Sequence, residues 1–92
     1  MRATLLDAAV TKRVLIVDDD EELRETEVDL IRAEGREATG AEDARLGLEV
    51  ARGWKPDVIL LDSALQGAMS AQELAEALGA DPQTSAIPVI LI

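Results

Sequence analysis

Apolar residues gather in three short runs along the chain, at residues 13–17, 56–62 and 87–92. Within these runs Val, Ile and Leu follow one another without the polar alternation of a strand that has one wet face. Continuous runs of this length are typical of strands buried on both faces of a sheet. Residues 36–40 form a weaker candidate, so the pattern predicts four strands.

A helical pattern follows the first apolar run. Its apolar positions are Leu23, Leu30 and Ile31. Their intervals place them on one face of a helix. Asp19 or Asp20 can cap the start of this helix, and Asp19 with Glu22 has the spacing of a capping box. Gly35 is expected to end it.

Two further helices are predicted between the remaining strands. Residues 42–52 carry small and aliphatic side chains on one face, and Gly53 is expected to stop that helix. Ser70 and Glu73 form a capping box that opens a third helix, which runs to about Leu78. Strands that alternate with helices through short loops predict a doubly wound α/β fold, with a parallel sheet and helices on both faces.

Composition narrows the classes of function. The chain has 92 residues, a formal net charge of −10, no histidine and no cysteine. Histidine-based acid–base chemistry, the usual zinc sites and disulfides are therefore excluded, and no basic patch suggests direct contact with nucleic acid. Residues 1–11 are expected to be a disordered leader before a single domain at 12–92. Because no segment reaches membrane-spanning length or has the form of a signal peptide, we expect a cytoplasmic protein.

Acidic residues follow two of the apolar runs directly. Asp18 and Asp19 come after the first run, and Asp62 ends the run at 56–62. If those strands are neighbours, three carboxylates meet at one edge of the sheet, where the carboxyl ends of parallel strands form sites. Mg²⁺ suits such oxygen ligands, and a carboxylate beside it can attack a phosphoryl group. Spacing alone equally allows ordinary helix caps and solvated charges.

Three segments together resemble the receiver domain of two-component response regulators. They read "RVLIVDDDEELRE", "KPDVILLD" and "DPQTSAIPVILI", and the resemblance runs from about Lys12 to Ile92. It implies a flavodoxin-like fold with a parallel sheet of order 2-1-3-4-5. Here the resemblance covers four strands, so we expect the order 2-1-3-4, with the fifth strand and the last helices absent.

The resemblance also implies a role for each acidic residue. Asp62 matches the phosphoacceptor, which also binds Mg²⁺. Asp19 matches the direct metal ligand, Asp18 the acid that holds the metal through water, and Ala64 a ligand through its backbone carbonyl. The implied function is to accept a phosphoryl group from a histidine kinase or a phosphotransfer protein, as a signalling domain rather than an enzyme.

The chain departs from the family pattern at several positions. Gln66 stands where the family usually has proline, Ser70 and Ala44 where it has glycine, and Glu27 where it has an aliphatic residue. The Ser or Thr and the Lys that complete the family's site are not present. These departures leave open a degenerate pseudo-receiver that serves as a protein-interaction module.

A third reading is a phosphatase of the haloacid-dehalogenase type, with Asp18 as nucleophile and Asp20 as acid–base. We rank it below the other two, because that family needs a later lysine and further acids.

Self-association is expected as well. With no fifth strand beside it, the last strand presents unpaired backbone groups that a second copy can pair with. Leu15, Val17, Leu30 or Ile31 are expected to be partly exposed without the last helix.

Overall fold

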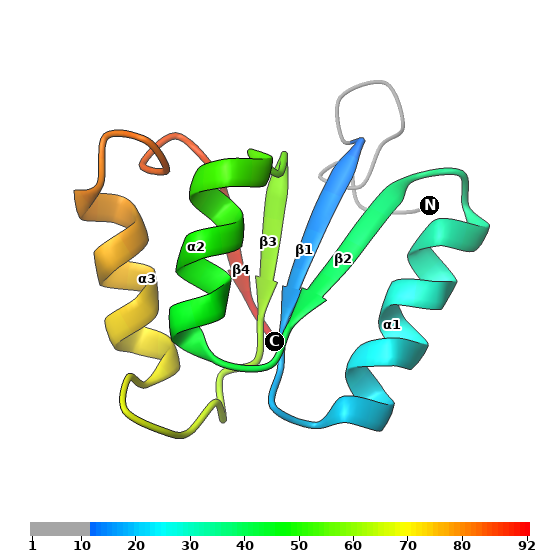
Figure 1. Cartoon of the computed structure of the whole chain (residues 1–92), viewed down its shortest axis with the longest axis horizontal. Helices are drawn as coiled ribbons and strands as arrows, with labels where there is room; N and C mark the ends of the chain where they lie inside the picture. Colours follow the sequence, from blue (N-terminus) through cyan, green and yellow to red (C-terminus); the bar gives the residue numbers. More distant parts are fainter. Residues whose placement is uncertain (1–11) are drawn as a thin grey trace.

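The computed structural model describes residues 12–92, so the predicted leader lies outside the described residues. Strands and helices alternate along this part of the chain, and the strands form one parallel sheet in the order β2-β1-β3-β4 (Figure 1). The strands are β1 (Arg13–Val17), β2 (Glu37–Ala41), β3 (Val58–Leu61) and β4 (Val89–Leu91). The helices are α1 (Glu21–Ala33), α2 (Ala44–Trp54) and α3 (Ala71–Ala80). The predicted fold class and strand order are confirmed.

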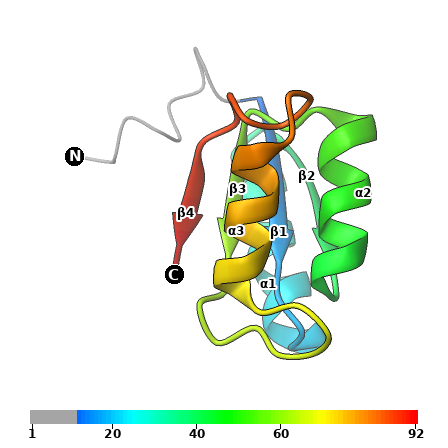
Figure 2. The same cartoon turned by 90° about the vertical axis from the view of Figure 1, so that its left-hand side faces the viewer.

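Helices cover both faces of the sheet. Helix α1 lies on one face, and α2 and α3 lie on the other (Figures 1 and 2). On the α1 side, Val14 and Ile16 pack with Val28, whereas Leu15 and Val17 belong to the larger core under α2 and α3. The four apolar residues of β1, Val14 to Val17, are fully buried, which explains why this run shows no polar alternation.

Helix α1 differs in detail from its prediction. The N-cap is Asp20, one of the two predicted candidates, and its side chain accepts a hydrogen bond from the Leu23 amide at 3.1 Å. The alternative cap at Asp19 and its capping box with Glu22 are wrong. The buried residue of the helix is Val28, while Leu23 and Leu30 are 48% and 63% exposed. The apolar stripe is therefore narrower than its spacing suggested.

Helices α2 and α3 run past their predicted ends, which were Gly53 for α2 and about Leu78 for α3. Gly53 and Trp54 are helical, and Lys55 takes the left-handed conformation that ends α2, with φ of 57°. A glycine inside a helix costs about 1 kcal/mol relative to alanine. Packing of Trp54 against the core under α2 offsets this cost, because an aromatic ring buries a large apolar area. Gly79 likewise lies inside α3.

The predicted capping box of α3 is confirmed. The Ser70 hydroxyl accepts from the Glu73 amide at 3.1 Å, and the Glu73 carboxylate accepts from the Ser70 amide at 2.9 Å. Replacing Ser70 with alanine is expected to lower the free energy of unfolding by about 1 kcal/mol. Urea denaturation measures the loss. Ser85→Ala, at an exposed site outside the helices, is the matched control and should leave the midpoint unchanged.

No helix among residues 12–92 combines the length and apolar content that crossing a bilayer requires.

Candidate phosphoryl-acceptor site

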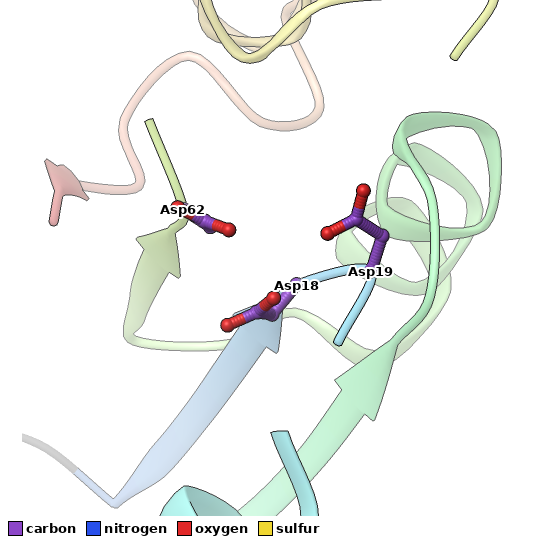
Figure 3. A group of neighbouring side chains, drawn as sticks. All are labelled: Asp18, Asp19 and Asp62. Atoms are coloured by element: carbon purple, nitrogen blue, oxygen red, sulfur yellow. The ribbon is translucent and has the colours of Figure 1, made fainter. Parts of the chain in front are cut away.

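The predicted acids meet at the carboxyl ends of two neighbouring strands. Strands β1 and β3 pair in register from Val14 with Val58 to Val17 with Leu61, so the residues that follow them lie side by side. Carboxylate oxygens of Asp18, Asp19 and Asp62 all lie within 4.8 Å of one another. Figure 3 shows them around a shared space at this edge of the sheet. The chain thus brings together the three side chains that spacing suggested.

Asp18 is held rigidly at the base of the site. It is 2% exposed, and its amide continues the sheet by donating to the Ala41 carbonyl at 3.1 Å. One carboxylate oxygen accepts from the Asp20 amide at 2.9 Å, and its backbone carbonyl accepts from the Arg24 guanidinium at 2.7 Å. Asp18 is therefore fixed from three sides, while Asp19 beside it is exposed.

Asp62 is held at its backbone and at one carboxylate oxygen. Its amide donates to the Val17 carbonyl at 3.0 Å, and its Oδ1 accepts from the Ala64 amide at 3.0 Å. The next residue, Ser63, donates its amide to the Ile92 carbonyl at 2.9 Å. These bonds fix the direction of the side chain, which is partly exposed.

The backbone carbonyl of Ala64 already has one partner. The Gln66 side-chain amide donates to it at 3.2 Å. A carbonyl oxygen has two lone pairs, so a cation can still share it. Gln66 is exposed and can turn away, and the donor set therefore remains compatible with the predicted ligand.

Within residues 12–92 the three carboxylates of Asp18, Asp19 and Asp62 form no ion pair with a lysine or arginine. Burial raises the pKa of Asp18, the bond from the Asp20 amide lowers it, and the neighbouring Asp62 and Asp19 carboxylates raise it further, for a net increase. A cluster of acids that is costly to ionise fits a hard divalent cation such as Mg²⁺, which prefers carboxylate and carbonyl oxygens.

This raised pKa predicts how stability depends on pH. Because the folded chain holds the Asp18 proton more tightly than the unfolded chain, Asp18 stabilises the fold below its unfolded pKa. That contribution is lost as the pH rises through the folded pKa. At neutral pH without metal, Asp18→Asn is therefore expected to raise the free energy of unfolding. Urea denaturation should show the gain, and it should vanish in mild acid. A loss at neutral pH would contradict this reasoning.

Two residues near the acids were not assigned to the site from the sequence. Arg24, on the first turn of α1, holds the Asp18 carbonyl, and only its place in an acidic stretch could have drawn attention to it. Glu27 stood out as a polar residue at an apolar position, and its carboxylate proves to be partly buried on the same side of the sheet.

Comparison with known proteins gives one consistent answer. Residues 14–92 match the family model described as the response regulator receiver domain. Protein PilH of Pseudomonas aeruginosa is 35% identical over 80 residues, which are 87% of this chain and 65% of PilH. The phosphate regulon transcriptional regulatory protein PhoB of the same organism is 40% identical over 83 residues, which are 90% of this chain and 36% of PhoB. The chain thus spans about two thirds of one relative and a third of the other.

Solved structures agree with the sequence relatives. The N-terminal domain of a response regulator receiver protein from Methanoculleus marisnigri JR1 superposes with a TM-score of 0.82 at 29% identity, covering 86% of this chain and 63% of that chain. The chemotaxis response regulator CheY4 of Vibrio cholerae gives a TM-score of 0.81 at 27% identity, with coverages of 88% and 67%.

Proposed function

Because the chain belongs to the response regulator receiver family, we propose that it accepts a phosphoryl group on Asp62 from a histidine kinase or a phosphotransfer protein. Mg²⁺ would be held by Asp19, Asp62 and the Ala64 carbonyl, with Asp18 bound through water. The observation that carries the proposal is the convergence of Asp18, Asp19 and Asp62, whose oxygens lie within 4.8 Å of one another. As predicted from the sequence, the chain would act in the cytoplasm as a signalling domain.

The arrangement of Asp62 supports its role as the acceptor. The Ala64 amide holds Oδ1. The Asp62 side chain is partly exposed, so its other carboxylate oxygen can attack phosphorus, and an O–P bond forms as the donor's bond to phosphorus breaks. The cation, when bound, would neutralise charge on the transferred group. Asp18 fits a supporting role better than a nucleophilic one, because it is 2% exposed.

The phosphatase reading receives no support from the geometry. Its acid–base residue would be Asp20, whose side chain caps α1 through the Leu23 amide. The interaction-module alternative keeps one supporting observation, the Gln66 amide on the Ala64 carbonyl, which competes with a metal ligand.

The function is tested by incubating the 92-residue chain with acetyl phosphate, with and without Mg²⁺, and measuring its intact mass. We expect an adduct of one phosphoryl group only when Mg²⁺ is present, and we expect it to be stable in acid and labile in base. The yield should be low, because residues 12–92 place no lysine beside the acids to stabilise the added charge.

We also propose that the chain self-associates through β4. Within the described residues, β4 pairs only with β3, and Leu91 and Ile92 are 53% and 50% exposed. Of the residues expected to be partly exposed, Leu15 and Val17 are fully buried under α2 and α3, so that part of the expectation is wrong. Leu30 is 63% exposed, as expected.

A further inference from the structure

Glu27 lies on α1 at a position where the helix faces the sheet. Its neighbour Val28 is the buried residue of the helix and packs with Val14 and Ile16. One carboxylate oxygen of Glu27, Oε1, is buried and has no hydrogen-bond partner among the described residues. Burying a carboxylate oxygen without a hydrogen-bond partner lowers the stability of the fold. The presence of Glu27 on the side of α1 that faces the sheet therefore requires an explanation.

Two acids of the site, Asp18 and Asp62, lie toward the same side of the sheet as Glu27. Successive side chains of a strand point to opposite faces. Asp18 therefore follows Ile16 to the α1 face, and Asp62 follows Leu60. Helix α1 begins just after Asp18–Asp20, and Glu27 lies about 9 Å along its axis from Glu21. Burial raises the pKa of Glu27, and the charges of Asp18 and Asp62 raise it further, as expected for an acid that shares their surroundings.

The nearest basic residue on the helix does not compensate this charge. Arg24, three residues before Glu27, donates to the Asp18 backbone carbonyl. Its side chain also lies over Gly40 of β2, close enough that a Cβ added there would meet Arg24 Cδ at 2.8 Å. Arg24 is thus directed toward β2, and no ion pair of the described residues includes Glu27.

We propose that Glu27 is a specificity-determining fourth acid of the site, which acts through space on whatever binds to Asp18, Asp19 and Asp62. The inference rests on the proposed function and goes beyond it by assigning a residue that does not touch the ligand. Its negative charge strengthens the binding of a divalent cation and weakens the approach of an anionic phosphoryl donor. Removing the charge should therefore weaken Mg²⁺ binding and speed phosphoryl transfer. Loss of a purely structural role in α1 would not produce these two opposite changes.

The first test compares Mg²⁺ affinity in variants that differ by one charge. Glu27→Gln keeps the shape of the side chain and removes the charge, while Glu25→Gln removes a charge from an exposed position of the same helix. Titration followed by amide NMR shifts should show that Glu27→Gln binds Mg²⁺ roughly fourfold more weakly, while Glu25→Gln binds as the wild type does. Equal affinities for Glu27→Gln and the wild type would overturn the proposal.

The second test reads the opposite effect at saturating Mg²⁺. Under that condition Glu27→Gln should take label from acetyl phosphate a few times faster than the wild type, because less negative charge faces the donor. A slower rate in Glu27→Gln than in the wild type, with the same fold by amide NMR, would overturn the proposal.

A third measurement separates this proposal from the proposed function. If the wild type and Asp19→Ala both fail to bind Mg²⁺, the metal site itself is wrong. The electrostatic interaction between Glu27 and the site acids is then measured from the pKa of the Glu27 carboxyl, by carbon NMR without metal. Asp62→Asn should lower this pKa, and an unchanged value would overturn the inference.

Discussion

Replacing Asp62 with asparagine is expected to abolish labelling of the chain by acetyl phosphate. Asparagine has nearly the same shape and can keep the bond from the Ala64 amide, which reaches Oδ1 at 3.0 Å. It lacks the second carboxylate oxygen that would attack phosphorus, so no acyl phosphate can form. Intact-mass measurement should find the adduct in the wild type and none in Asp62→Asn. Asp29→Asn, which removes an exposed acid from α1, is the matched control and should label normally.

The variant should remain folded, so a missing adduct can be assigned to chemistry. Asp62→Asn also removes one of the charges that raise the pKa of Asp18, and the metal-free variant should therefore be at least as stable as the wild type. An adduct that survives in Asp62→Asn would place the acceptor elsewhere. A folded wild type that binds Mg²⁺ and takes no label would favour the interaction-module alternative.

The 92-residue chain is expected to elute as a concentration-dependent dimer, and Leu91→Lys should return it to a monomer. The outer edge of β4 offers backbone groups that a second β4 can pair with, and the exposed Leu91 and Ile92 lie beside it. An isologous pairing of two such edges would join two sheets into one. A lysine on an edge strand opposes this pairing, because its charge would be buried in the contact.

Size exclusion with light scattering measures the change. Leu46→Lys is the matched control, since it places the same charge on an exposed leucine of α2, a helix that lies apart from β4 (Figure 2). We expect Leu46→Lys to dimerise like the wild type. The negative charge of the chain works against association, so raising the salt concentration should favour the dimer. A wild type that stays monomeric at high concentration would exclude β4 as a pairing edge.

Much of the fold could be predicted because its strongest signals are local. The central strands β1 and β3 are continuous apolar runs, and each is followed by an acid, so Asp18 and Asp62 could be placed at one sheet edge before any coordinates. Ser70 and Glu73 likewise marked the start of α3, because a capping box depends only on residues close in sequence.

The helix ends could not be predicted in the same way. Gly53 looked like a stop signal, but α2 continues through Gly53 to Trp54, which packs against the core under this helix. This contact joins residues far apart in sequence, which a local pattern cannot show. Leu23 and Leu30 looked like core residues by their spacing, yet the sheet face under α1 is reached mainly by Val28.

The residues of the candidate site could likewise be predicted only in part. The resemblance supplied the roles of Asp19 and Ala64, and the structure placed Asp19 and Asp62 together. The resemblance could not predict the contact of Arg24 with the Asp18 carbonyl or the burial of the Glu27 carboxylate oxygen. Both depend on how α1 is oriented over the sheet.

The amides of Asp18 and Asp62 donate to carbonyls of the neighbouring strands, and the Ser63 amide donates to the carbonyl of Ile92, just after β4. The backbones of Asp18 and Asp62 therefore extend the hydrogen bonding of the sheet, and they cannot move far unless these bonds open. Their amides should exchange with solvent as slowly as those of the core strands. The rigid ladder also ties Ser63 to the Ile92 carbonyl, so strain introduced at the acceptor would be carried along a hydrogen-bonded path into the end of β4. A phosphoryl group added to Asp62 would therefore affect the end of β4, whose outer edge is the one that a second chain can pair with.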